Sequence, residues 1–68
     1  MKNTIKVERA KRNMTQQELA EKAGVSRQTI NSVESQKYVP STVLALKIAK
    51  IFDIRVDAIF ELEDDDFL

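Results

Sequence analysis

Hydrophobic residues recur every three or four positions along most of the chain, a spacing typical of amphipathic helices. Residues 60–63 instead alternate between apolar and acidic, which favours a short edge strand, and residues 4–5 are a candidate for a partner strand. The pattern therefore predicts an all-α domain with room for a short antiparallel strand pair formed by the termini. Helices are expected over residues 5–13, 16–23, 27–34, 42–52 and a short stretch from about residue 57.

The first and last helices are defined by the fewest signals. Val7, Ala10 and Met14 recur at spacings of three and four, so they are expected to form the buried stripe of the first helix. Asp57 is a residue type that caps helix starts, so it is expected to cap the last helix. Residues 64–68 are expected to form a frayed tail.

The second and third helices have clear start and stop signals. Thr15 is a good N-cap, and Glu18, three residues later, completes a capping box. Gly24 ends the second helix because glycine readily adopts the left-handed conformation of a C-terminal cap. Ser26 then caps the third helix, and Ser41 caps the fourth. Two short helices joined by a tight turn with one glycine have the layout of a helix-turn-helix.

The residues between these caps meet the packing demands of that motif. Ala20 is small enough to let the two helices cross closely, and Val25 can anchor the turn inward. Ile30 and Val33 form the narrow apolar edge of the third helix and leave a broad polar side outside. An ordinary αα-hairpin in a helical bundle is the alternative interpretation.

The polar side of the third helix carries residue types that read base pairs. Arginine, glutamine and asparagine side chains pair bidentately with guanine or adenine in the major groove, and helix-turn-helix proteins use the start of the second helix of the motif for this purpose. Amides and hydroxyls near helix starts, and polar residues in the next loop, can hold phosphates. The expected base contacts are Arg27, Gln28, Asn31 and Ser32, and the expected phosphate contacts are Gln16, Ser26, Lys37 and Tyr38.

Composition narrows the possible functions. The 68 residues suffice for one small domain, here residues 1–62, followed by an acidic tail over residues 63–68. The chain has no Cys and no His, which excludes disulfides and removes the commonest metal ligands and general base. No apolar run approaches 18 residues, so we expect a cytoplasmic protein without a membrane partner. We expect no enzymatic activity, cofactor, metal or small-molecule ligand.

The net charge of zero conceals an asymmetry. Residues 1–38 hold eight Lys and Arg against four Asp and Glu, whereas residues 39–68 hold three against seven. Such a bipolar distribution fits a domain whose N-terminal part faces a polyanion. A solvated surface with an acidic tail is the alternative interpretation.

Residues 5–60 resemble the lambda-repressor/Cro family of helix-turn-helix domains, also called the xenobiotic-response-element family, including short stand-alone members such as the cytolysin repressor. The resemblance rests on residues 14–30 (MTQQELAEKAGVSRQTI), Glu34, Pro40-Ser41 and residues 46–49 (LKIA). It implies a five-helix fold, a homodimer and binding to a DNA operator.

The resemblance also implies roles for individual residues. The position of Gln16 binds phosphate in the family and braces the first recognition side chain, here Arg27. The positions of Arg27, Gln28 and Ser32 face bases. A family ion pair between the first and third helices falls on Arg9 and Glu34.

The fourth helix has more apolar residues than one buried face requires. Ala45, Ile48, Ala49 and Phe52 suffice for the core. A neighbouring edge is therefore expected to form an isologous dimer interface, although the same side chains could instead cover the core of a monomer. The expected interface residues are Leu44, Ile51, Ile59 and Phe60.

Together these observations predict a sequence-specific regulator of transcription that binds double-stranded DNA. The simplest form is a dimeric repressor at a palindromic operator, with residues 27–34 as the recognition helix. The alternative is an antitoxin-like or other protein-interaction module, in which the acidic tail would dock a basic partner.

Overall fold

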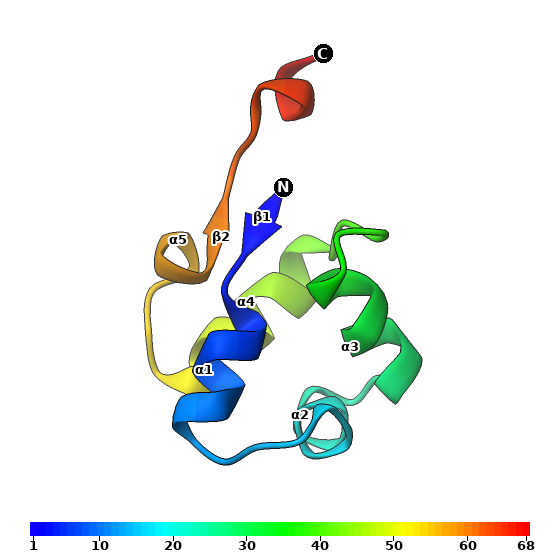
Figure 1. Cartoon of the computed structure of the whole chain (residues 1–68), viewed down its shortest axis with the longest axis vertical. Helices are drawn as coiled ribbons and strands as arrows, with labels where there is room; N and C mark the ends of the chain where they lie inside the picture. Colours follow the sequence, from blue (N-terminus) through cyan, green and yellow to red (C-terminus); the bar gives the residue numbers. More distant parts are fainter.

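The computed structural model describes all 68 residues as a helical domain with a two-stranded sheet at its termini (Figure 1). This arrangement confirms the predicted fold class. The elements in chain order are β1 (Lys2–Asn3), α1 (Ile5–Lys11), α2 (Gln16–Ala23), α3 (Arg27–Glu34), α4 (Thr42–Phe52), α5 (Val56–Ile59), β2 (Phe60–Glu61) and a 3₁₀ helix (Asp64–Phe67).

The predicted caps set the boundaries of α2, α3 and α4. The Thr15 hydroxyl accepts a hydrogen bond from the Glu18 amide at 3.0 Å, and the Glu18 carboxylate accepts one from the Thr15 amide at 3.1 Å. Ser26 and Ser41 each accept a hydrogen bond at 3.1 Å from the amide three residues on. Gly24 ends α2 with a φ of 72°, a conformation that a side chain would strain. Each helix therefore begins or ends where its own local sequence stabilises it.

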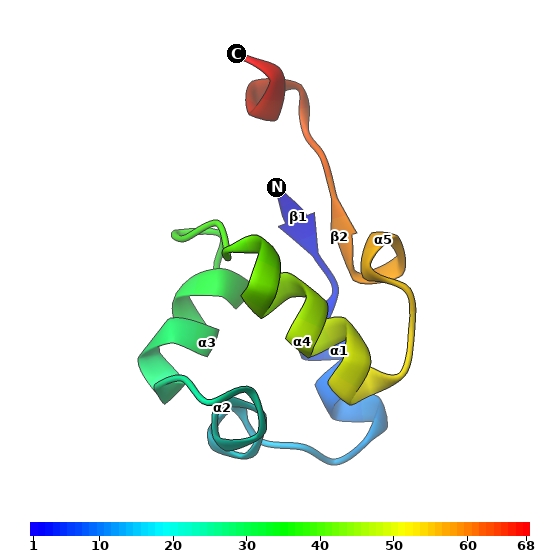
Figure 2. The same ribbon diagram turned by 180° about the vertical axis from the view of Figure 1, so that it is seen from behind.

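The core lies between the helices and joins all five of them. Seen from behind, α4 crosses the domain with α2 and α3 on one side and α5 on the other (Figure 2). No helix has both the length and the apolar character needed to cross a membrane. The buried apolar side chains are Ile5, Leu19, Ala20, Ala23, Ile30, Val33, Leu44, Ile48, Ala49, Phe52 and Ile59.

The orientation predicted for α1 was wrong. Val7 and Ala10 are exposed, and the helix instead turns Ile5 and Glu8 inward. Glu8 can be buried because the Arg12 guanidinium pairs with its carboxylate at 2.8 Å. Apolar spacing alone did not reveal an inner side that is partly charged.

Arg12 also connects the end of α1 to the end of α4. Its guanidinium donates to the Phe52 carbonyl at 2.7 Å and lies 4.8 Å from the centroid of the Phe52 ring. The carbonyls at the end of a helix lack partners within the helix, so this hydrogen bond satisfies one of them. The helix α1 itself ends at Lys11, two residues earlier than predicted.

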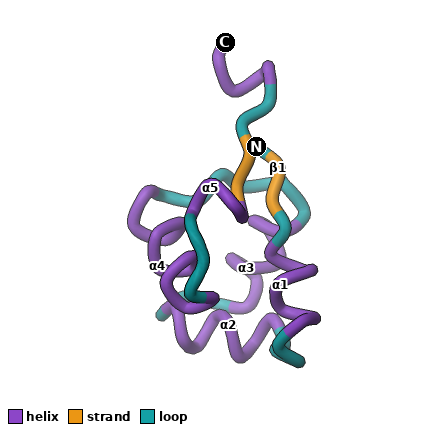
Figure 3. The backbone as a smooth tube through the Cα atoms, turned by 90° about the vertical axis from the view of Figure 1, so that its left-hand side faces the viewer, coloured by secondary structure: helices purple, strands orange, loops and turns teal.

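The two strands pair antiparallel, with Lys2 opposite Glu61 and Asn3 opposite Phe60. The strand at the C-terminal side is thus shorter than predicted, and its partner lies two residues before the candidate at 4–5, because Ile5 already belongs to α1. The side view in Figure 3 shows the two strands next to each other, with the tail continuing beyond them.

Two expectations for the C-terminal part need correction. Asp57 does not cap α5, which begins at Val56; its carboxylate instead pairs with Arg55 at 3.0 Å. The tail is not frayed but forms the 3₁₀ helix, in which Asp66 accepts a hydrogen bond from the Glu63 amide at 2.8 Å. The amino group of Met1 lies 3.0 Å from Glu63 and 3.2 Å from Asp66, and these ion pairs hold the tail close to β1.

Candidate nucleic-acid interface

The recognition helix predicted from the sequence is α3, and it presents its polar side to solvent. Ile30 and Val33 are buried against the core, which fixes the rotation of the helix. Arg27, Gln28 and Asn31 are exposed, and Ser32 is half-buried. The four residues predicted to contact bases therefore lie on the part of α3 that the core does not use.

Gln16, at the start of α2, joins two of these side chains. Its carbonyl oxygen accepts a hydrogen bond from Arg27 Nη1 at 3.4 Å. Its amide nitrogen donates to Asn31 Oδ1 at 3.2 Å and to Glu34 Oε1 at 3.3 Å. Because the nitrogen faces two oxygens and the oxygen faces a guanidinium, the orientation of the Gln16 amide is defined by its partners. The network orders Arg27 and Asn31, while Gln28 takes no part in it.

A bidentate ion pair between Arg9 and Glu34 holds α3 on α1. Arg9 Nε lies 2.6 Å from Glu34 Oε2, and Arg9 Nη2 lies 3.0 Å from Oε1. The third guanidinium nitrogen donates to the Met14 carbonyl at 2.9 Å, just before α2. The hydrogen bonds with Glu34 raise the pKa of Arg9 above its ordinary value. This pair, implied by the family resemblance, is present and connects α1, α2 and α3.

The loop after α3 folds back onto the exposed side of the helix. The amides of Lys37 and Tyr38 both donate to the Ser32 carbonyl, at 2.9 and 3.2 Å. Gln36 allows this turn by adopting a φ of 64°. A shallow depression results beside α3, and its lining brings together the predicted contact residues Ser26, Gln28, Ser32 and Tyr38 with Thr29. Lys37 is exposed in the same loop.

Sequence reasoning missed two residues next to this surface. Asn3, in β1, donates from Nδ2 to the Val33 carbonyl at 2.9 Å and accepts from the Ile5 amide at 3.2 Å. Lys6, in α1, lines a second depression beside α3 with Gln16 and others. Asn3 and Val33 are 30 residues apart, so no local pattern could have indicated their contact. Lys6 could have been singled out only as one of several cations in the N-terminal half.

The predicted dimer interface requires correction. Leu44 is 6% exposed and Ile59 is 2% exposed, so both belong to the core of a single chain. Ile51 and Phe60 are half-buried and pack against that core. The exposed apolar residues of α4 are instead Val43 and Leu46, the latter 53% exposed. Nearly the whole of α4 is apolar, so its sequence did not define which side faces inward.

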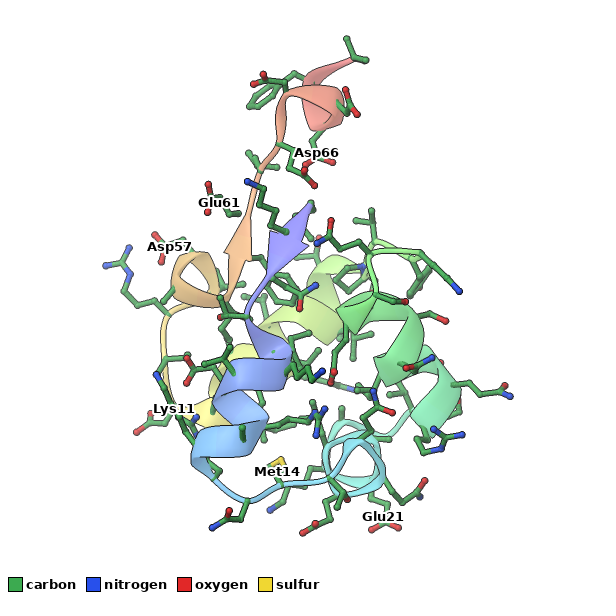
Figure 4. The ribbon with its side chains drawn as sticks, viewed as in Figure 1. Lys11, Met14, Glu21, Asp57, Glu61 and Asp66 are labelled. Carbon is green, nitrogen blue, oxygen red and sulfur yellow. The ribbon has the colours of Figure 1, made fainter.

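Three labelled acidic residues of the C-terminal part lie away from α3. Figure 4 shows Asp57, Glu61 and Asp66 on the side and end of the molecule formed by α5, β2 and the tail. In Figure 1, α2 lies at the end of the longest axis opposite the tail, and α3 lies on the side of the domain opposite α5. The charge asymmetry of the sequence thus becomes a spatial separation, which leaves the exposed side of α3 accessible to a polyanion.

Comparisons with known proteins agree with this geometry. The helix-turn-helix family model matches residues 5–59. MJ0272 of Methanocaldococcus jannaschii, an uncharacterized HTH-type transcriptional regulator, is 54% identical over 66 residues, which cover 97% of this chain and 100% of that protein. YgzD of Bacillus subtilis, described in the same words, is 45% identical over 96% of this chain and 98% of its own. An uncharacterized HTH-type transcriptional regulator of Archaeoglobus fulgidus is 47% identical over 97% of this chain and 93% of its own. The resemblance noted in the sequence is confirmed: the chain belongs to the helix-turn-helix family of the lambda-repressor/Cro type.

Proposed function

We propose that this protein is a sequence-specific regulator of transcription that binds double-stranded DNA with α3 in the major groove. The observation that carries the proposal is the division of α3 into a buried apolar edge and an exposed side of base-reading residue types. The relatives named HTH-type transcriptional regulators support the same function.

Base readout is assigned to Arg27, Gln28, Asn31 and Ser32. Arginine pairs with guanine, and glutamine or asparagine pairs with adenine, each through two hydrogen bonds worth about 1–3 kcal/mol of discrimination. The bonds from Gln16 order Arg27 and Asn31 before DNA arrives, which lowers the entropic cost of binding. Gln28 is exposed at the start of α3, where helix-turn-helix proteins contact base edges.

Phosphate binding is assigned to Gln16, Ser26, Lys37 and Tyr38. Such contacts set the register of the protein on the duplex and carry no sequence information. Ser26 and Tyr38 line the depression beside α3, and the Lys37 amide is fixed on the Ser32 carbonyl. The backbone of one DNA strand would follow this side of the helix, past Ser26, Lys37 and Tyr38.

The active form is proposed to be a homodimer that represses by occupying a palindromic operator. We assign its interface to the outer side of α4, where Val43 and Leu46 are exposed one turn apart. Ile51 and Phe60, which are half-buried against the core, remain candidates for a smaller part in it. An exposed apolar surface of this kind is typical of a protein–protein contact. A two-fold dimer would place two α3 helices about 34–36 Å apart, the spacing of successive major grooves on one side of DNA.

Selection of bound sites from a pool of random duplexes tests this function. We expect one enriched palindromic sequence with half-sites about 10–10.5 base pairs apart, centre to centre. Retention of duplexes without any enriched sequence would refute specific readout, and enrichment of a single half-site would refute the dimer.

A further inference from the structure

The recognition helix α3 lies between two depressions. The first is the one beside Tyr38 that contains predicted phosphate contacts. The second lies where α1 and the start of α2 meet α3, and only one of its lining residues, Gln16, has been assigned to a phosphate so far. The second depression is lined by Lys6, Arg9, Gln16, Asn31, Glu34 and Ser35.

Within the second depression, Lys6 is the one charged group without a partner. Arg9 and Glu34 neutralise each other through their bidentate pair. Lys6 is exposed and forms none of the ion pairs of the chain. The depression therefore has a net charge of +1, located on a flexible side chain that can extend toward an anion.

We propose that Lys6 binds a phosphate of the DNA backbone on the side of α3 opposite Lys37 and Tyr38. The inference rests on the proposed function, since it takes α3 to lie in the major groove. That groove is about 12 Å wide and is bounded by two phosphate backbones, so a helix within it has one strand on each side. Lys6 supplies the free positive charge on the side that Lys37 does not serve.

The salt dependence of binding tests this assignment. Each protein cation that neutralises a phosphate contributes about 0.9 to the slope of log K against log salt concentration. Lys6→Gln should therefore make the slope shallower by about 0.9 per bound protomer, and at 0.1 M salt the affinity should fall about 8-fold per contact. Because phosphate contacts carry no sequence information, the same factor is expected on a selected site and on a scrambled duplex.

Lys11→Gln is a matched control on the same helix. Lys11 is paired with Glu8 at 3.4 Å, and Figure 4 places it on the side of α1 away from α3. Lysine and glutamine have similar helix propensities, so neither substitution should change the stability of α1 much, which circular dichroism would verify. We expect Lys11→Gln to keep the original slope, and Lys6→Arg to keep it as well.

The outcomes separate this inference from the function on which it rests. If the unsubstituted protein binds no duplex, the proposed function fails. If it binds a selected site and Lys6→Gln retains both the slope and the affinity, the assignment of Lys6 is wrong while the function stands. An equal loss in Lys6→Gln and Lys11→Gln would also overturn the assignment, because it would show a general effect of net charge.

Discussion

Removing the carboxylate of Glu34 should strongly destabilise the fold. Glu34 and Arg9 are mostly buried, with side chains 8% and 14% exposed. Glu34→Leu would leave the Arg9 guanidinium with the Met14 carbonyl as its remaining hydrogen-bond acceptor. Breaking a fully buried ion pair from one side costs 3–5 kcal/mol, and the residual exposure of this pair places the expected loss at about 3 kcal/mol. For a domain of this size that loss lowers the melting temperature by about 12–24 °C.

Thermal unfolding followed by circular dichroism, at one fixed protomer concentration, measures the effect. Arg9→Met combined with Glu34→Leu should lose less stability than the sum of the single variants, because no buried charge is left unpaired. Arg55→Gln is the matched control, since it breaks an ion pair whose side chains are 84% and 66% exposed and should leave the melting temperature unchanged. If Glu34→Leu lowers the melting temperature no more than Arg55→Gln, the pair does not hold α3 on the scaffold.

Two further predictions can be tested. The first compares a core residue with a residue of the proposed dimer interface, and the second concerns the pH dependence of stability. Leu44→Asp should abolish folding, because it buries a carboxylate in the apolar core. Leu46→Asp should instead keep the circular dichroism spectrum and halve the mass measured by sedimentation, and an unchanged mass would place the interface elsewhere. The hydrogen bond from Arg12 lowers the pKa of Glu8 below its ordinary value of 4.5, so its contribution to stability is present above that pH and is lost as the pH falls through the lowered value. Urea unfolding between pH 6 and 3 should show this loss in the unsubstituted protein, and the free energy of unfolding of Glu8→Gln should depend less on pH. Parallel pH profiles of the two proteins would show that Glu8 is not the source of the loss.

The α2–turn–α3 unit could be predicted from the sequence because its signals are local. Thr15, Gly24 and Ser26 act on amides or dihedral angles within three residues of themselves. The buried edge of α3 could also be predicted from the sequence, because Ile30 and Val33 are the only apolar residues of that helix. The exposed side that would read DNA follows directly from these constraints.

The rest of the fold depended on contacts between distant residues. The end of α1 is held by Arg12 on Phe52, 40 residues away, and the end of α3 is held by Asn3 across 30 residues. Leu44 and Leu46 could not be ranked for burial because α4 is apolar on most of its surface. The tail's order comes from the pairing of Asp66 with Met1 at the other end of the chain. Such contacts have no signature in the local pattern.

Base readout by α3 is tested most directly with Gln28→Ala. The side chain is uncharged, exposed and outside the Gln16 network, so its removal alters neither the salt dependence nor the scaffold. Affinities of the two proteins are measured by fluorescence anisotropy at one salt concentration, on the selected duplex and on a scrambled duplex of equal length. We predict a loss of about 1–3 kcal/mol on the selected duplex and none on the scrambled one. Equal losses on both duplexes, or no loss on either, would contradict the account.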